Sequence, residues 1–569
     1  MLISSDLLVH LGPYIRQILQ SANVSQAAVH AEQAGGTPQR GIYSNNGGNE
    51  SGGDIVDDDS TIYAIGSQTK LLIALLFIII VDIPLSASQE ERHEGYRILK
   101  QEFPNPWDIE FTVLFNRFHD DHNQIEDLPG KPTLWHVLIH FNALPPMTHD
   151  ILGPDGTSFT SKGSFLRAAL RRANTGNTQE DGSVYSNGNY ILAGCLIEAI
   201  AGQPLASVIE ELLFSPLDMT RTFLGYPGPS VTGIAPPYTM SVDGHRVPAE
   251  TMRYGVGDTV NAAFGAYSCC RDLAILFREL LTCINDANYQ SIFDRSTVRS
   301  FLMRRVTLDD KTKDAFTIFG IRTTLDSSLV GSMSINRLVT KDVCSTYRLG
   351  TRKNGKQVPA YYLAGHIEGY SSCYYFIPKY SAFVIVLTDT TGICDAADHI
   401  SRLLLQEIFD LELPRRGITH NKKVDIPDMS SRAATQGREL LKKFADEDSQ
   451  QDVKDPVSIQ LDGTYVNKDS ELSIVIRPGS LLVSMVGTAP NSTNGLVQTQ
   501  DMGLIRTGNY TVRLRPLSIV GFTLDRLDYN SWRELNLDLV VDKDSQKVIR
   551  LERKKCWKNS VDKFTRQGD

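Results

Sequence analysis

The stretch I-Y-A-I-G-S-Q-T-K at residues 62–70, with the apolar run at 71–81 that follows it, decides the fold of this chain. A short extended run is broken at Gly66, and a strongly apolar helix is predicted to follow Ser67. Helix positions i and i+3 share a face, so the Lys70 ammonium can reach the Ser67 hydroxyl. Burial of this helix would lower the pKa of Lys70 and make its neutral amine available as a base. Taken alone, a polar helix start explains S-x-x-K equally well.

A second polar motif, Y-S-N, stands at residues 185–187, before another apolar run. A tyrosine becomes a general base only when a cation lowers its pKa, and Lys70 could supply that charge to Tyr185. Asn187 could donate a hydrogen bond to a substrate carbonyl. A plain turn is the simpler interpretation of this motif by itself, because Ser-Asn-Gly favours turns.

A third motif, G-H-I-E-G, occupies residues 365–369 between two predicted strands. A backbone N–H near Glu368 and Gly369 could complete an oxyanion hole with the N–H of Ser67. His366 could donate a hydrogen bond to a substrate. By itself this motif would be a glycine-rich turn with a surface histidine.

The three motifs in this order resemble the serine β-lactamases and penicillin-binding proteins, most closely their class C and esterase branch, which includes fungal transesterases. The segments L-I-H-F-N-A-L-P at 138–145, G-A-Y-S-C-C-R-D-L at 265–273 and F-G-I at 319–321 are also similar to segments of that family. The resemblance implies an α/β (α+β) fold of the β-lactamase/transpeptidase type. Such a fold has an antiparallel sheet flanked by helices and a second, all-helical part.

The resemblance also implies a mechanism. Ser67 would attack an acyl carbonyl to form an acyl-enzyme, with Lys70 and Tyr185 moving the proton. Asn187 would orient the substrate, and His366 stands at the start of the third motif. The family has Lys-Thr-Gly or His-x-Gly there, whereas this chain has Glu368 in place of the glycine. A carboxylate at this point should repel anionic β-lactams, so efficient β-lactamase activity is not expected.

Three functions are compatible with these residues. The first is hydrolysis of a small-molecule ester or amide through an acyl-enzyme on Ser67. The second is acyl transfer from an ester or thioester in small-molecule (secondary) metabolism, as in a transesterase. The third is a catalytically inactive binding scaffold, for which the altered third motif is the argument.

The pattern of the chain predicts three parts. Residues 1–412 mix strands and helices and form the β-lactamase-like domain, in which 34–60 and 214–262 are predicted as loops and 86–131 as a surface insertion. Residues 413–456 are predicted as a linker with a short helix near 434–445. Residues 457–569 alternate with period 2, which predicts an antiparallel β-domain, either a lipocalin-like barrel or a sandwich.

The composition of the chain limits which classes of partner and which cellular compartment are expected. The 569 residues carry a formal net charge of −9, which argues against nucleic acid as a partner. The eight cysteines are scattered without a C-x-x-C pair, which suggests free thiols. No signal-peptide pattern or apolar run of membrane-spanning length is found, so a cytoplasmic protein is expected. No nucleotide fingerprint is present, and the H-D-D-H run at 119–122 suits a solvated surface, so neither a cofactor nor a metal is expected. The oligomeric state is left open.

Overall fold

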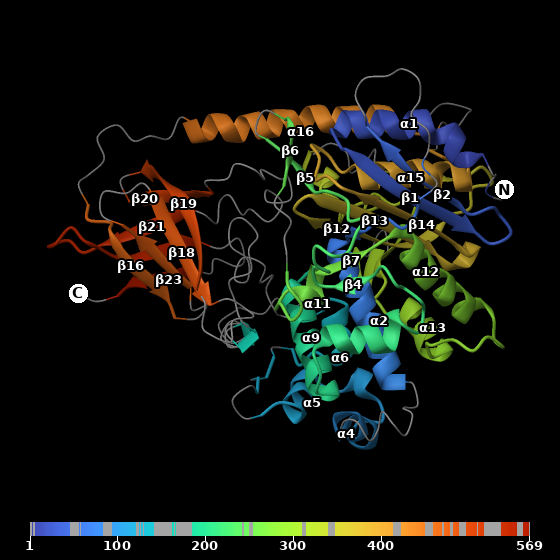
Figure 1. Cartoon of the computed structure of the whole chain (residues 1–569), viewed down its shortest axis with the longest axis horizontal. Helices are drawn as coiled ribbons and strands as arrows, with labels where there is room; N and C mark the ends of the chain where they lie inside the picture. Colours follow the sequence, from blue (N-terminus) through green and yellow to red (C-terminus); the bar gives the residue numbers. More distant parts are fainter. Residues whose placement is uncertain are drawn as a thin grey trace.

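The computed structural model describes most of residues 6–413, residues 423–449 and the strands between 459 and 567. The larger gaps are at 46–55, 83–93, 142–161, 167–184, 250–253, 310–313 and 340–347 in the first part, and at 450–458, 489–496, 517–535 and 555–560 in the last part. Figure 1 shows the mixed helix-and-sheet body on one side and a separate group of strands on the other.

An eight-stranded antiparallel sheet forms the centre of the body, in the order β2-β1-β14-β13-β12-β10-β9-β8. Its middle strands are buried along almost their whole length, which accounts for their nearly continuous apolar sequences. In chain order the strands are β1 (Gln26–Gln33), β2 (Gln39–Ser44), β8 (Val306–Asp309), β9 (Asp314–Thr317), β10 (Gly320–Thr324), β12 (Pro359–Ile367), β13 (Tyr370–Ile377) and β14 (Ala382–Thr388).

Helices cover both faces of this sheet (Figure 1). On one face α15 (Ala396–Phe409) packs on β13 and β14, and α1 (Leu7–Ala22) packs on α15. On the other face Phe277 of α12 (Cys270–Asn285) stacks on Phe376 and Phe383. Beyond that face lies the helical part of the body, built from α2 (Thr69–Asp82), α4 (Glu94–Glu102), α5 (Phe111–Arg117), α6 (Leu134–Leu138) and α9 (Asn187–Ala201).

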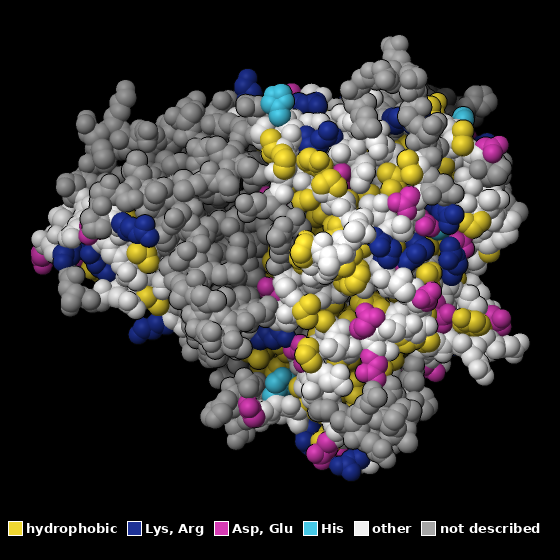
Figure 2. All heavy atoms as spheres, viewed as in Figure 1, with side chains coloured by type: hydrophobic (Ala, Val, Ile, Leu, Met, Phe, Trp, Pro, Cys, Tyr) yellow, Lys and Arg dark blue, Asp and Glu magenta, His cyan; other side chains and the backbone are white. Residues whose placement is uncertain are grey.

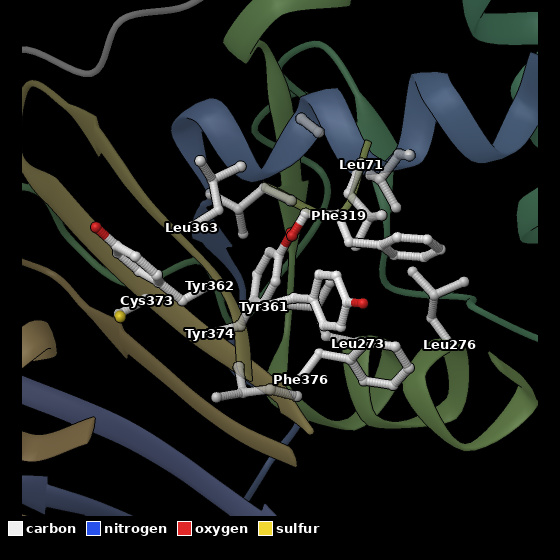
Figure 3. Packing of buried hydrophobic residues seen from close by; sticks show 14 of the residues in the cluster. Leu71, Leu273, Leu276, Phe319, Tyr361, Tyr362, Leu363, Cys373, Tyr374 and Phe376 are labelled. Carbon is white, nitrogen blue, oxygen red and sulfur yellow. The ribbon is translucent and has the colours of Figure 1, made fainter. Parts of the chain in front are cut away.

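Helix α2 joins the sheet to the helical part. Every residue from Thr69 to Val81 is buried, so the helix is apolar on all sides and needs no solvent-facing stripe. Leu71 lies near Phe319, in a cluster that also includes Leu363 of β12 and Leu273 and Leu276 of α12 (Figure 3). Each such fully buried side chain contributes about 1.5–3 kcal/mol, so this packing holds the start of α2 firmly against the sheet.

Three segments differ from their predictions. The predicted loop at 34–60 contains β2, and the predicted loop at 214–262 contains β4 (Phe223–Leu224), β5 (Tyr238–Met240), β6 (Arg246–Pro248) and α11 (Asn261–Phe264). The predicted surface insertion at 86–131 contains α4, η2 (Pro106–Asp108) and α5, and it buries Trp107, Phe111 and Phe115. The many charged residues in this stretch obscure the helical spacing of its apolar residues in the sequence. In the structure these apolar residues are buried, and α4 packs against α9.

The helix in the predicted linker is longer than expected. It is α16 (Ile426–Ser449), a helix of 24 residues that begins eight residues before 434 and packs on α1 and α15. Ile426, Met429 and Ala433 are buried on its inner side. Tertiary packing of these small and apolar residues extends the helix beyond the part that the sequence pattern indicated.

The last part of the chain is a closed antiparallel barrel, which is the first of the two predicted alternatives. Its interior is filled by apolar side chains such as Tyr465, Leu537 and Phe564. Closure by pairing β16 with β23 leaves no open sheet edge. The strands are β16 (Gly463–Asn467), β17 (Leu472–Ile476), β18 (Leu482–Thr488), β19 (Val497–Gly508), β20 (Thr511–Pro516), β21 (Asn536–Val541), β22 (Val548–Lys554) and β23 (Val561–Arg566).

Among the described residues no single helix has both the length and the apolar composition needed to cross a membrane. Only α9 together with Leu205–Phe214 would pass that test, as a pair bent by 78°. On the face of the molecule shown in Figure 2, the described acidic and basic side chains are interspersed.

Candidate active site

Ser67 lies in the short helix η1 (Gly66–Gln68), directly before α2. The turn is possible because Gly66 adopts a φ of +52°, a left-handed conformation that side chains disfavour. The Thr69 hydroxyl donates to the Gly66 carbonyl over 2.6 Å and accepts from the Ala266 N–H over 3.0 Å. Ala266 belongs to the G-A-Y-S segment at 265–268, which therefore braces the turn that carries the serine.

The backbone of strand β12 lies in direct contact with the backbone of this turn. A Cβ on Gly66 would lie 2.9 Å from the His366 nitrogen, and a Cβ on Gly365 would lie 3.0 Å from the Ser67 nitrogen. A Cβ on Gly365 would also press on the Ile65 carbonyl oxygen. The two glycines thus let the strand and the serine turn approach more closely than any other residues would allow.

We expect Gly365→Ala to lower kcat by about 100-fold, because a displacement of the order of 1 Å at a reacting group costs that much. Steady-state kinetics with a short acyl ester measures the effect. The matched control is Gly12→Ala in α1, where a Cβ meets only ordinary contacts at 3.4 Å or more. A Gly365→Ala variant as fast as the Gly12→Ala variant would show that this approach does not position Ser67.

Lys70 is only 2% exposed and its Nζ donates three hydrogen bonds. The acceptors are Ser67 Oγ at 3.1 Å, Asn187 Oδ1 at 2.7 Å and the Ala263 carbonyl at 2.8 Å. Burial lowers the pKa of Lys70 well below its usual value of 10.5. The helix spacing thus brings Lys70 to Ser67 as the sequence predicted, and Asn187 joins them from α9.

The neutral form of Lys70 suits this set of partners. A neutral amine has two N–H groups and one lone pair. The buried oxygens of Asn187 and Ala263 accept the two N–H groups, which leaves the lone pair directed at Ser67 Oγ. In that state the serine hydroxyl donates and Lys70 accepts, which is the arrangement that a general base requires.

Tyr185 completes the group. Its phenol oxygen is 2.6 Å from Ser67 Oγ, and the Lys70 ammonium lies 4.8 Å from the centre of its ring. The ring is held by His140, whose imidazole packs against it at an angle of 35° with centroids 4.4 Å apart. Phe316 of β9 packs against both rings. The phenol is therefore placed by packing as well as by its hydrogen bond.

His140 positions Tyr185, a role that was not predicted from the sequence. It has a φ of +61°, which is uncommon for a residue with a side chain, and its Nδ1 accepts the N–H of Ser186 at 3.2 Å. Burial and the nearby charge of Lys70 lower its pKa, so the imidazole stays neutral. Its place at the end of the L-I-H-F segment was the only signal in the sequence.

The third motif is not arranged as predicted. His366 pairs with Ser371 across the β12–β13 hairpin, and its ring points to the α15 side of the sheet, where it lies 3.4 Å from Asp395. The predicted contact of this ring with substrate therefore does not fit the structure. The Gly369 N–H donates to the Thr391 hydroxyl at 2.9 Å, so it is already engaged and does not support the predicted oxyanion donor. Glu368 lies half-buried at the hairpin turn.

The alternation of side chains along β12 accounts for this placement. Neighbouring residues of a strand point to opposite faces of the sheet. Strand β12 pairs with β13 up to Ile367 and Tyr370, and the chain turns at Glu368 and Gly369. Gly365 therefore faces Ser67, and His366 faces the other side.

No cluster of three potential metal ligands occurs among the described residues. His119 stacks on Phe115, while Asp121 and His122 lie outside the described part of the chain. The cysteines that the structure describes are free and buried, and burial raises the pKa values of their thiols, for example that of Cys195 to about 12. Cys344 and Cys556 lie outside the described residues.

The sequence model of the family described as Beta-lactamase matches residues 39–407, well over half of the chain. The chain belongs to the beta-lactamase family. This confirms the predicted family, and the sheet flanked by helices confirms the predicted fold class. A curated relative, a putative D-alanyl-D-alanine carboxypeptidase of Salmonella typhi, is 26% identical over 143 residues, which cover 21% of this chain and 32% of that protein. The match thus spans about a third of the length of that relative.

Two solved structures illustrate the similarity. The octameric penicillin-binding protein homologue from Pyrococcus abyssi is 14% identical, with a TM-score of 0.51 over 98% of both chains. A beta-lactamase/D-alanine carboxypeptidase from Yersinia pestis is 14% identical, with a TM-score of 0.47 over 71% of this chain and 99% of its own. At these identities the first comparison shows the fold of the beta-lactamase-family chain and nothing about its substrate.

Proposed function

We propose that this beta-lactamase-family chain is a serine hydrolase that cleaves an ester or amide of a small molecule through an acyl-enzyme on Ser67. The observation that carries the proposal is the convergence of Lys70 Nζ and the Tyr185 phenol on Ser67 Oγ, at 3.1 Å and 2.6 Å. The family match and the names of the related proteins support a hydrolase of the serine type. The inactive-scaffold alternative rests on the third motif, but the altered motif leaves this convergence intact.

The first half of the reaction forms the acyl-enzyme. Ser67 Oγ attacks the carbonyl carbon of the ester while neutral Lys70 takes the hydroxyl proton. The N–H of Ser67, close to the start of α2, stabilises the negative charge that develops on the carbonyl oxygen. The C–O bond to the alcohol then breaks, and the departing alkoxide takes the phenol proton of Tyr185.

The second half releases the acid. The Tyr185 phenolate takes a proton from water as the water oxygen attacks the acyl carbon. The bond from Ser67 Oγ to the acyl carbon breaks, and the serine recovers its proton from the Lys70 ammonium. The enzyme returns to its starting protonation state, with one water consumed for each ester cleaved.

We further propose that the preferred substrates lack a carboxylate near the scissile bond. The third motif has His366 where the family can place a lysine, and that ring points away from Ser67. Glu368 stands at the hairpin turn that follows His366. A carboxylate in this motif disfavours an anionic substrate.

We expect Glu368→Gln to speed acylation by an anionic cephalosporin about tenfold, the size of one charge interaction of 1–2 kcal/mol near a protein surface. The rate with a neutral p-nitrophenyl ester should stay unchanged. Stopped-flow acylation rates for both substrates measure this, and the neutral ester is the internal control. Equal rates for the wild type and the variant with both substrates would show that Glu368 does not face the substrate.

Mass spectrometry after brief exposure to a panel of p-nitrophenyl acyl esters tests the proposed reaction itself. The expected result is an acyl adduct on the peptide that contains Ser67. Absence of any adduct, together with no release of p-nitrophenol across the panel, would contradict the hydrolase proposal. Adding small alcohols and amines to the same reactions would show acyl transfer as an increase in the turnover rate.

A further inference from the structure

Strands β12 and β13 connect the site to a polar cluster on the opposite face of the sheet. On the Ser67 side, Gly365 lies against the serine turn and the Ser372 hydroxyl donates to the Ile65 carbonyl at 2.9 Å. The neighbouring residues on these strands are His366, which follows Gly365, and Ser371, which precedes Ser372. They pair with each other, and their side chains lie on the opposite face of the sheet, the one that α15 covers. The same short hairpin thus contacts the nucleophile with one face and this cluster with the other.

The His366 ring lies between Ser371 and Asp395. Its Nδ1 is 3.2 Å from Ser371 Oγ. Its Nε2 is 3.4 Å from Asp395 Oδ2, within ion-pair distance but without a hydrogen bond. The side chain of His366 is 7% exposed and that of Asp395 is fully buried. A buried carboxyl group is costly unless polar groups surround it, so Asp395 gains from the imidazole beside it.

Asp395 is itself held rigidly. It caps the N-terminus of α15 by accepting the Asp398 N–H at 3.2 Å, and Ser334 Oγ donates to its Oδ2 at 2.7 Å. Asn336 Oδ1 accepts the Asp395 N–H at 2.8 Å. The carboxylate is therefore a fixed point to which the His366 ring is attached.

The nearest buried ion pair does not involve Asp395. Asp398 is engaged by Arg402, whose Nε lies 2.9 Å from Asp398 Oδ2. Both of these side chains are buried, and they balance each other. The Asp395 carboxyl group instead lies beside the His366 ring and at the positive end of α15.

The order Ser371–His366–Asp395 resembles a catalytic triad in composition, but it does not have the geometry of one. In a triad the imidazole takes the serine proton on Nε2 and faces the carboxylate with Nδ1. Here the two nitrogens are reversed, and Ser371 is only 3% exposed. A substrate cannot reach this serine, so the cluster acts on the site through the backbone.

We propose that His366 and Asp395 form a positioning pair that holds the end of β12 against the serine turn, and so sets the place of Ser67 for the proposed acylation, on which this inference rests. The backbone of His366 is the part of β12 that lies against Gly66. Loosening the ring from Asp395 therefore loosens the strand at the point where it contacts the turn of the nucleophile.

His366→Ala, His366→Gln, Asp395→Asn and the double variant His366→Ala/Asp395→Asn test the pair. We expect His366→Ala to slow acylation about 10–100-fold with KM within about twofold, because the groups that bind substrate are unchanged while the nucleophile is displaced. His366→Gln should recover most of the rate, because its amide is polar and can lie between Ser371 and Asp395 as the imidazole does. Asparagine keeps the helix cap and removes only the charge, and the double variant should be no slower than the slower single variant.

The matched control is Ser401→Ala, a buried residue of the same helix whose hydroxyl donates to the Ala397 carbonyl one turn back. Hydrogen–deuterium exchange gives a readout that needs no turnover. We expect peptides covering 62–70 and 359–372 to exchange faster in the His366→Ala variant than in the wild type. The same peptides should exchange at the wild-type rate in the control. The exchange measurement tests whether His366 holds the strand even if the wild type forms no acyl adduct. A missing adduct would contradict only the hydrolase proposal.

Three results would overturn the inference. Unchanged exchange in the His366→Ala variant would show that the ring does not hold the strand. Additive losses in the double variant would show that the two residues act separately. A His366→Gln variant as slow as His366→Ala, with a raised KM, would show that the imidazole contacts substrate.

Discussion

Replacing Ser67 by alanine is expected to lower kcat for short acyl esters by a factor on the order of 10⁴ or more. The hydroxyl is the only group of this site that can form the acyl-enzyme, so its removal takes away the covalent route and not merely a part of the binding energy. The residual rate would come from the polar groups that remain around the substrate. Initial rates of p-nitrophenol release measure the loss.

The Ser67→Ala protein should remain folded, because the serine side chain is half-buried and makes no packing contact that alanine cannot replace except its two hydrogen bonds. Its thermal transition should lie within a few degrees of the wild type. A Ser401→Ala variant, which removes a buried hydroxyl of α15 that bonds to the Ala397 carbonyl, is the matched control and should keep most of the activity. Turnover of the Ser67→Ala variant at more than a hundredth of the wild-type rate would rule out Ser67 as the nucleophile.

Lys70→Met should slow acylation by about 10²–10⁴-fold, the usual contribution of a general base. Methionine fills the same narrow volume but offers no lone pair to the serine proton. The exposed lysine Lys356 provides the matched control, since Lys356→Met removes a charge of the same kind far from Ser67 in the sequence and should leave the rate unchanged. Retention of more than a tenth of the wild-type rate by Lys70→Met would mean that another group accepts the proton.

The pH dependence of the wild type should carry the signature of Lys70. Burial lowers its pKa well below 10.5, and the neutral amine is the active form. The acylation rate therefore rises with pH as Lys70 loses its proton, and it reaches its plateau well below pH 10.5. The Lys70→Met variant should lack this rise. The same shift means that the wild type loses folding stability as the pH falls from 10.5 towards the folded pKa of Lys70, because the unfolded chain binds this proton first. The stability gained by Lys70→Met relative to the wild type should therefore grow over that range and stay constant below the folded pKa.

Local sequence determines the contact between Ser67 and Lys70. Their separation of three residues places them on one face of a helix, and the structure has them 3.1 Å apart. The burial of Lys70 also follows from the sequence, because the apolar residues of 71–81 leave α2 with no side suited to water. The period-2 alternation after residue 457 likewise predicted antiparallel strands, since a strand buried on one face needs that alternation.

Contacts between segments far apart in the chain could not be predicted from local sequence patterns. Tyr185 reaches Ser67 across 118 residues, and its motif looked like a plain turn until His140 and Phe316 were seen to pack on its ring. The sequence also did not indicate which side of α16 is buried. Small residues such as Ala433 and Ala434 form a packing surface only when another helix lies against them.

The family, the turn with Ser67 and Lys70, and the alternating strands of the barrel could be predicted from the sequence, because each depends on residues close together along the chain. The direction in which the third motif faces could not be predicted, because it depends on the pairing of two strands. The side of the sheet that His366 takes depends on how β12 pairs with β13, and one residue of difference in that pairing moves the ring from the substrate side to Asp395. Pairing register is a property of two strands and their turn together, so the composition of the motif could not reveal it.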